Sequence, residues 1–185
     1  MITGKNYIGN QLSAKGNKTY TTFNPQINTE NTNVFTEATS EEINAATQLS
    51  TEAFKTYKLV SGEKKAVFLK AIAEEIENLG DDLISVYMSE SGLPQGRAMG
   101  ERGRTVGQLR AFAAHIENGS WVNATIDTAQ PERQPMPKVD LRKMNVPLGP
   151  IVVFGASNFP LAFSTAGGDT AAALAAGCPV IVKSH

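Results

Sequence analysis

Apolar residues recur at helical spacing in the middle of the chain, from about residue 39 to residue 119. Thr39 and Glu42 form a capping box, in which each side chain accepts a free backbone N–H of the other residue, just before the apolar stripe of Ile43, Ala46 and Leu49. This pattern predicts a helix that begins next to Thr39. The same spacing predicts three further helices: one that opens near Ser61, one around residues 83–87 that stops at Gly92, and one that has Pro94 at its first position and ends at Gly119.

Two other stretches are typical of strands. Residues 7–34 alternate polar and β-prone residues around turn-forming Gly, Asn and Pro, which predicts an edge hairpin or an extended arm. Residues 120–145 combine strand-like pieces with many Pro, Thr and Gln residues and have few side chains with which to bury themselves. We therefore expect this second stretch to form a ribbon that projects from the body or pairs with another subunit.

The last part of the chain has the pattern of a β–α–β unit. Residues 151–154 form a continuous apolar run, which predicts a parallel strand covered on both faces. Loop residues 155–158 follow, and Pro160 then opens a predicted helix that ends at Gly177, a suitable left-handed cap. A second apolar strand is predicted over residues 179–182.

This unit brings two polar residues to one edge of the predicted sheet. Because a crossover of this kind keeps its two strands parallel, the loop after the first strand and the residues after the second emerge at the same edge. In open α/β sheets that edge is where ligands bind. Asn158 and Lys183 are therefore expected to face one ligand of nucleotide size.

The charge balance argues against two classes of partner. The chain has 17 Lys and Arg residues against 18 Asp and Glu residues, so neither nucleic acid nor an anionic membrane surface is expected to bind it. Between residues 146 and 182 Asp169 is the only charged residue, but Pro and Gly interrupt every window long enough to span a membrane. We interpret this stretch as a buried core.

Cysteine and histidine are too few for a disulfide framework or a metal site. Cys178 is the single cysteine, and the two histidines are His115 and His185. The first residues lack a basic region followed by an apolar run, which is the pattern of a secretory signal. The cytoplasm is therefore the expected compartment.

A longer stretch carries a family resemblance. The three-glycine turn of dinucleotide-binding proteins is absent, because Gly155, Ala156, Ser157 and Asn158 supply only its first glycine. The whole segment PLGPIVVFGASNFPLAFSTAGGDTAAALAAGCPVIVK nevertheless closely resembles the aldehyde dehydrogenase family, whose members share the Asn-Phe-Pro turn and the later Lys. The resemblance runs from Asn24 to Lys183 and spans well under half of a typical family member.

The resemblance implies an α/β fold class and an organisation in three parts. The chain would be the amino-terminal part of a Rossmann-like NAD(P)-binding domain with preceding helices and a β-ribbon oligomerisation arm. Residues 1–119 would supply the amino-terminal arm and helices, residues 120–146 the β-ribbon, and residues 147–185 the first, incomplete βαβ unit. A homo-oligomer is the partner that this arm implies.

Two segments narrow the resemblance to one branch of the family. ESGLPQGRAMGERGRTVGQLRAF and the GASNFPL segment are similar to enzymes that oxidise 2-oxoglutarate semialdehyde (2,5-dioxovalerate) to 2-oxoglutarate, which are related to long-chain fatty aldehyde dehydrogenases. A small-molecule aldehyde would then be the substrate. The cofactor would be NADP or NAD, and the choice stays open because the residue that helps make it falls beyond His185.

The resemblance assigns Asn158 a catalytic part. In this family a cysteine thiolate attacks the aldehyde, and the Asn158 amide would donate a hydrogen bond to the resulting oxyanion. The alternative is that Asn158 caps the helix that begins beside it. The family's catalytic Cys and general-base Glu would lie beyond His185, whereas Cys178 is interpreted as a small buried residue.

The cofactor would lie along the edge that Asn158 and Lys183 share. Lys183 would donate to the ribose hydroxyls of adenosine, and its alternative is a strand-end lysine that extends into solvent. By the same resemblance, four more residues would line the cofactor beside Asn158: Phe154, Gly155, Ala156 and Ser157.

Three residues are candidates for the substrate entrance: Phe159, Arg104 and Gln108. Arg104 would pair with a substrate carboxylate, and the alternative is a surface or interhelical salt bridge.

A different class of function also remains open: a non-catalytic interaction module in which residues 120–145 pair with a partner subunit. A fragment of a long-chain fatty aldehyde dehydrogenase is the third possibility.

Overall fold

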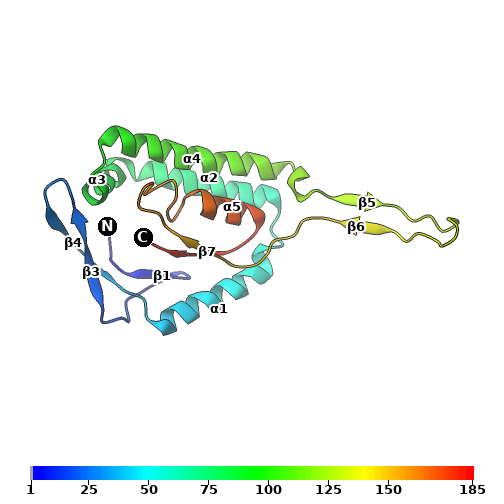
Figure 1. The fold of residues 1–185 in the computed structure, drawn as a ribbon, viewed down its shortest axis with the longest axis horizontal. Coiled ribbons are helices and arrows are strands. Elements are labelled where there is room, and N and C mark those ends of the chain that lie inside the picture. The colour runs from blue at the N-terminus through cyan, green and yellow to red at the C-terminus, as the bar shows by residue number, and fades with distance from the viewer. Residues whose placement is uncertain (1) are drawn as a thin grey trace.

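A computed structural model describes residues 2–185, which form helices, three antiparallel pairs of short strands and one parallel β–α–β unit (Figure 1). The helices are α1 (Ser40–Tyr57), α2 (Gly62–Asn78), α3 (Gly80–Ser91), α4 (Gln95–Glu117), the 3₁₀ turn η1 (Ser120–Val122) and α5 (Gly168–Ala176). The strands are β1 (Asn6–Ile8), β2 (Gln11–Ser13), β3 (Thr19–Asn24), β4 (Thr29–Thr36), β5 (Thr125–Asp127), β6 (Leu141–Lys143), β7 (Ile151–Phe154) and β8 (Val180–Lys183). Within this described range no helix is long and apolar enough to cross a membrane.

Three helices build the main core. α2 and α4 lie side by side, and α5 packs against both of them (Figure 1). Much of the contact is made by alanines, whose small side chains let the helices approach closely. The buried apolar residues of this cluster are Ala66, Leu69, Ala73, Val106, Leu109, Ala113, Ile116, Ala171 and Ala175.

The predicted capping box at the start of α1 is confirmed. The Thr39 hydroxyl accepts the N–H of Glu42 at 3.2 Å, and the Glu42 carboxylate accepts the N–H of Thr39 at 2.8 Å. Glu42 also accepts hydrogen bonds from the Ser13 hydroxyl and the Lys15 N–H, and the bond from Ser13 is the main reason why its pKa is lowered. One buried carboxylate therefore both starts α1 and ties the first hairpin to it.

The other three predicted helices are also present, within a residue or two at their ends. Ser61 caps α2, and α3 stops before Gly92 as expected. α4 ends at Glu117, two residues before Gly119. Pro94 is not the first residue of α4 but the residue just before it, where its extended backbone leads into the helix.

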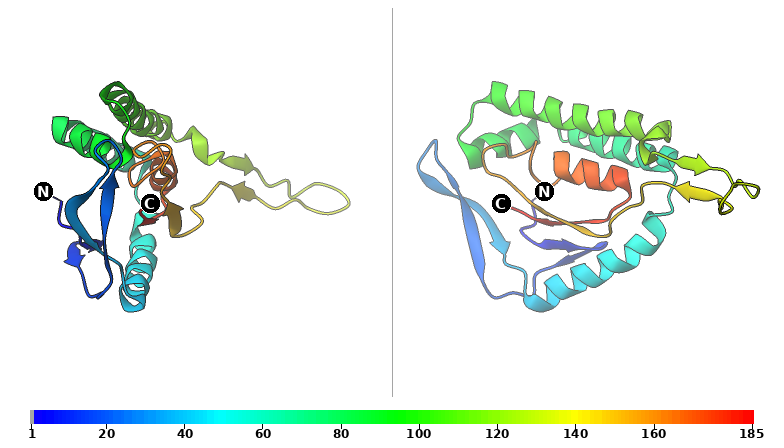
Figure 2. Two further views of the ribbon diagram at one scale, coloured as in Figure 1. Left: turned by 60° about the vertical axis from the view of Figure 1, so that its left-hand side comes forward. Right: turned by 45° about the vertical axis from the view of Figure 1, so that its right-hand side comes forward.

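The strand-like stretches form hairpins, as predicted. β1 pairs with β2 and β3 pairs with β4, both antiparallel, in the region before α1. β5 and β6 form an antiparallel ribbon that stands well away from the body in all three views (Figures 1 and 2). All six residues of these two strands are exposed, including Ile126 and Leu141. The predicted projecting ribbon is thus confirmed, and its pairing with another subunit stays a prediction.

β7 and β8 form the one parallel pair among the described strands. The register runs from Ile151 opposite Val180 to Phe154 opposite Lys183, and α5 makes the connection between them. Gly177 ends α5 with φ at 94°, the left-handed conformation that the sequence predicted for it. The predicted β–α–β unit is therefore present.

The predicted helix from Pro160 to Gly177 is wrong over its first half. Residues 160–167 form turns, and α5 begins only at Gly168. The backbone doubles back here: the N–H of Gly168 donates to the carbonyl of Ala162 at 2.9 Å. A side chain on Gly167 would place its Cβ 2.5 Å from that same carbonyl oxygen, so the close approach needs glycine.

Within residues 2–185 only one of the two expected covers of the first strand is present. Val153 is buried beneath α5, but Val152 and Phe154 on the opposite face of β7 are 53% and 71% exposed. A cavity of about 900 Å³ lies between β8, β1 and α1, whose residues line it. An apolar run in the sequence indicates that a strand is shielded from water, but the run does not indicate which segment of the protein covers the strand.

Leu109 is the residue whose truncation tests the helical core. Its side chain is 1% exposed in the contact between α2, α4 and α5, so Leu109→Ala leaves a cavity that costs about 2–5 kcal/mol of unfolding free energy. Urea unfolding followed by circular dichroism measures the loss. Leu59→Ala, at an exposed leucine, is the matched control and should change stability by less than about 0.5 kcal/mol. Equal losses in the two variants would contradict this description of the core.

Candidate active site

The ends of β7 and β8 meet at one edge of the molecule, as the sequence predicted. Phe154 lies opposite Lys183, and the N–H of Gly155 donates to the Lys183 carbonyl at 3.0 Å. Opposed residues of neighbouring strands point to the same face of a sheet. The exposed Phe154 ring and the exposed Lys183 side chain therefore share the open face and the ligand edge.

The loop after β7 folds back over itself before α5 begins. The N–H of Ala156 donates to the carbonyl of Phe163 at 2.8 Å, which closes the loop. Ser157 and Asn158 lie at its exposed tip, while Gly155 and Ala156 are half-buried at its base. The candidate cofactor residues therefore form one continuous strip from β7 to the loop tip.

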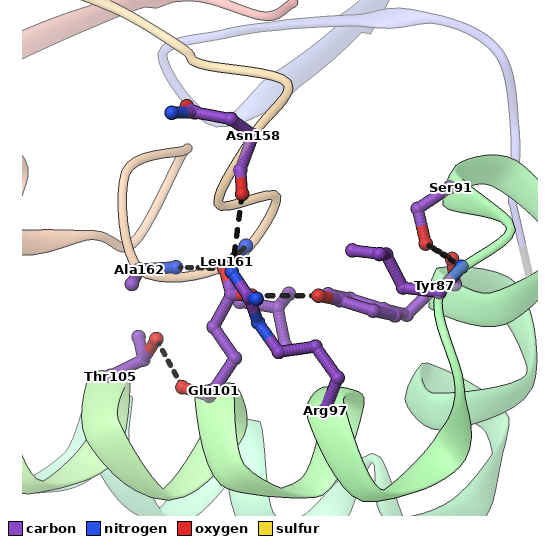
Figure 3. A network of polar contacts seen from close by, with 9 residues as sticks. Tyr87, Ser91, Arg97, Glu101, Thr105, Asn158, Leu161 and Ala162 are labelled. Atoms are coloured by element: carbon purple, nitrogen blue, oxygen red, sulfur yellow. Dashed lines mark hydrogen bonds and ion pairs between the residues drawn. The ribbon is translucent and has the colours of Figure 1, made fainter.

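Asn158 does not cap a helix. The N-terminal cap of α5 is Gly167, so the alternative interpretation of Asn158 is wrong. The backbone carbonyl of Asn158 accepts a hydrogen bond from Arg97 at 3.3 Å, while its side chain points away from that contact (Figure 3). Within residues 2–185 the Asn158 amide has no hydrogen-bond partner, which leaves both of its N–H groups available to a ligand.

A buried carboxylate on α4 holds the same loop. One oxygen of Glu101 accepts the backbone N–H groups of Leu161 and Ala162 at 2.8 and 3.0 Å (Figure 3). Its other oxygen accepts the Tyr87 hydroxyl at 2.7 Å and lies 3.5 Å from Nε of Arg97. Glu101 is 3% exposed, so its contacts with Tyr87 and the loop N–H groups act in a poorly solvated environment, whereas the Arg97 side chain is 41% exposed.

These contacts shift two pKa values in opposite directions. Burial alone raises the pKa of Glu101, but the N–H donors of Ala162 and Leu161, the Tyr87 hydroxyl and the charge of Arg97 outweigh it, so the net pKa is lowered. Burial, followed by the hydrogen bond to Glu101, raises the pKa of Tyr87 to about 12. Glu101 is therefore a carboxylate and Tyr87 a neutral donor at neutral pH.

Sequence reasoning did not find Glu101, although a signal for it was present. Ala98, Thr105 and Leu109 lie at helical spacing from Glu101 on the buried side of α4. A charged residue in such a stripe is buried only when polar groups compensate it. That observation would have pointed to a buried carboxylate, but not to the distant loop that it binds.

Of the three candidate substrate residues, Arg104 and Phe159 lie together, whereas Gln108 lies elsewhere. The guanidinium of Arg104 lies 5.3 Å from the ring centre of Phe159 and 5.1 Å from that of Phe163. No carboxylate within the described residues pairs with Arg104, so neither of the expected salt bridges is present there. Gln108 instead packs against the backbone at the start of α5, 2.8 Å from the position of a Cβ on Gly168.

Cys178 is buried, as expected of a structural residue. It follows Gly177 and precedes β8, with 3% of its surface exposed. Its position at the end of the helix lies away from the loop tip that carries Asn158. The structure thus agrees with the interpretation of Cys178 as a small core residue.

The fold is that of an α/β protein with a parallel β–α–β unit whose two strand ends meet at one edge. The model of the aldehyde dehydrogenase family matches residues 12–185. The chain belongs to the aldehyde dehydrogenase family.

Two curated relatives match the chain over almost its whole length. It is 51% identical over 185 residues to alpha-ketoglutaric semialdehyde dehydrogenase 2 of Azospirillum brasilense, and 48% identical over 182 residues to alpha-ketoglutaric semialdehyde dehydrogenase of Acinetobacter baylyi. These matches cover 100% and 98% of the chain but only 35% of each relative. The chain therefore spans about a third of the length of these relatives.

Solved structures agree on the fold. The chain superposes on betaine aldehyde dehydrogenase of Staphylococcus aureus, a structure in complex with NAD⁺, with a TM-score of 0.84 and 19% identity, covering 98% of this chain and 35% of that one. An aldehyde dehydrogenase of Brucella melitensis biovar abortus gives a TM-score of 0.84 at 22% identity, with 98% and 36% covered. The predicted α/β fold class is thus confirmed.

The lowered pKa of Glu101 predicts how the stability of the protein depends on pH. A carboxyl whose pKa is lower in the folded protein than its ordinary value of about 4.5 stabilises the fold above that value, and the contribution is lost as the pH falls through the lower, folded pKa. Glu101→Gln removes this titration. Melting temperatures measured from pH 7 to pH 3 should therefore fall more steeply below about pH 4.5 in the wild type than in the variant. Parallel curves would contradict the assignment.

Proposed function

We propose that this chain is the amino-terminal part of an NAD(P)-dependent aldehyde dehydrogenase that oxidises 2-oxoglutarate semialdehyde to 2-oxoglutarate. The observation that carries the proposal is the geometry at the carboxyl ends of β7 and β8. There the loop that carries Asn158 leaves β7 next to Lys183, and the Gly155 N–H donates to the Lys183 carbonyl. The identity of about one half to two alpha-ketoglutaric semialdehyde dehydrogenases supports this substrate over a long-chain fatty aldehyde.

The residues at this edge are suited to a dinucleotide. Lys183 offers three N–H donors at an exposed strand end, and the hydroxyl oxygens of a ribose can accept hydrogen bonds from them. Phe154 offers an exposed apolar ring beside Lys183. Gly155, Ala156 and Ser157 would complete the contact through backbone and small side chains. When bound, NAD or NADP supplies the hydride acceptor for the oxidation.

Asn158 would act on the reacting carbonyl. After attack by a thiolate supplied from outside residues 1–185, the aldehyde oxygen carries negative charge, and an amide N–H aimed at that oxygen stabilises it. The unpaired Asn158 amide at the exposed loop tip is a donor of this kind. Its backbone is already tied to Arg97, so the donor need not be reordered when substrate binds.

Arg104 would bind the carboxylate of the substrate. Its guanidinium is exposed, has no carboxylate partner among residues 2–185, and lies over the Phe159 ring next to Asn158. Phe159 would hold both the guanidinium and the carbon chain of the aldehyde. Gln108 lies at the start of α5 and would act through that contact.

The β5–β6 ribbon would serve a second copy of the chain. Its exposed apolar side chains, among them Ile126 and Leu141, have nothing to pack against in one protomer. This favours an oligomerisation arm in a homo-oligomer.

A purely non-catalytic interaction module is less well supported, because it gives no function to the loop that carries Asn158. The cytoplasm is the compartment that we propose for the enzyme, and Cys178 as the single cysteine of this chain is compatible with it.

Asn158→Ala tests the oxyanion role. In the full-length enzyme we expect kcat to fall about a hundredfold or more, the usual effect of removing one oxyanion donor. Steady-state kinetics with 2-oxoglutarate semialdehyde measures the change. Asn44→Ala, at an exposed residue of α1, is the control and should leave kcat unaltered. An Asn158→Ala enzyme with full turnover would refute the role.

Arg104→Gln tests the substrate class. Losing a charge-assisted contact to the carboxylate should lower kcat/KM for 2-oxoglutarate semialdehyde by about ten- to a hundredfold, or roughly 1.5–3 kcal/mol. Turnover of pentanal, which has no carboxylate, should stay within about twofold of the wild type. If both aldehydes lose the same factor, Arg104 does not recognise the carboxylate.

A further inference from the structure

The loop that carries Asn158 is held mainly by contacts with α4. Residues 155–167 contain no regular secondary structure, so their position has to be set by other parts of the chain. Two of these contacts are made by the loop backbone at Asn158 and just after it. One is made by the Asn158 carbonyl with Arg97, and the other by the N–H groups of Leu161 and Ala162 with Glu101 (Figure 3).

Glu101 connects both of these contacts. Its first oxygen binds the two loop N–H groups directly, and its second oxygen faces Nε of Arg97. Nη2 of the same Arg97 side chain binds the Asn158 carbonyl. The two N–H donors of Arg97 point to different partners, so movement of the Glu101 carboxylate would be felt at Asn158 by two routes.

Tyr87 prevents that carboxylate from turning. Its hydroxyl comes from α3 and donates to the same Glu101 oxygen that faces Arg97. With both oxygens occupied by donors from three directions, Glu101 has one orientation in a site that is almost closed to water. A charged acceptor also draws its donors to short distances, as the bond of 2.8 Å from Leu161 illustrates.

Such precision matters for an oxyanion donor and for little else in this loop. An amide stabilises an oxyanion only when its N–H lies about 2.7–3.1 Å from the oxygen. Misplacement by roughly 1 Å can cost about a hundredfold in rate. A loop that only had to cover the core could be held by apolar packing, which would avoid burying a carboxylate.

We propose that Glu101 is a positioning residue, which fixes the Asn158 amide at the reacting carbonyl through the loop backbone and through Arg97. This inference rests on the oxyanion role proposed above for Asn158. Glu101 touches neither substrate nor cofactor. Its effect on catalysis therefore passes entirely through Asn158, and this makes it separable from a general effect on folding.

A double-mutant cycle in the full-length enzyme tests the inference. Glu101→Gln keeps an oxygen that can accept the two loop N–H groups. The amide NH2 that replaces the other oxygen cannot accept a hydrogen bond from Arg97, so the Arg97 side chain loses this partner. We expect kcat to fall about tenfold, as for a partial misplacement of the donor. In the Asn158→Ala background the same substitution should change kcat by no more than about twofold, because the donor is already absent.

Two further variants keep the cycle decisive. Arg97→Gln breaks the link to the Asn158 carbonyl at a side chain that is 41% exposed, so it answers the question even if Glu101→Gln does not fold. Its kcat should fall in the wild-type background and stay the same in the Asn158→Ala background. Glu117→Gln, at an exposed carboxylate of the same helix, is the control, and it should leave kcat unchanged in the wild-type and in the Asn158→Ala background.

Binding of the cofactor separates positioning from damage to the whole site. The dissociation constant of NADP⁺ or NAD⁺, measured by fluorescence titration, should be the same in Glu101→Gln and the wild type. If Glu101→Gln lowers kcat by the same factor in both backgrounds, or weakens the cofactor as much as it slows turnover, Glu101 is merely structural and the inference fails. If instead Asn158→Ala itself keeps full turnover, the proposed oxyanion role fails first, and the inference falls with it.

Discussion

The parallel pairing of β7 with β8 is the constraint on which the rest of the structure depends. It places Phe154 opposite Lys183 and requires a crossover, which α5 supplies by packing its alanines against α2 and α4. The crossover in turn needs the loop before α5 to double back at Gly167, and that loop is the one that carries Asn158. The helical core, the strand edge and the candidate site are therefore consequences of one topology.

Local patterns predicted most of the elements, because their causes lie within a few residues. The capping box of Thr39 and Glu42, the cap at Gly177 and the apolar stripe of α4 each involve neighbours along the chain, and each is present. The shared edge for Asn158 and Lys183 could also be predicted, because the handedness and direction of a crossover are general rules.

Features that depend on distant contacts could not be predicted. The segment after Pro160 has helical composition, but the chain doubles back there through the bond from the Gly168 N–H to the Ala162 carbonyl, a close approach that needs glycine at position 167. The open face of β7 and the Gln108 contact with α5 likewise depend on which segments meet in space. Glu101 itself was detectable as a charge in an apolar stripe, while its partners on the loop were not.

The Asn158 amide and Lys183 are proposed to serve one reaction at one edge of the sheet. The most direct test is a crystal structure of the full-length enzyme with NAD(P)⁺ and a bound aldehyde, in which two distances are measured. Nδ2 of Asn158 should lie about 3 Å from the aldehyde oxygen, and Nζ of Lys183 within about 3 Å of a ribose hydroxyl. A cofactor bound away from this edge, or an aldehyde oxygen whose donors come from elsewhere, would contradict the account.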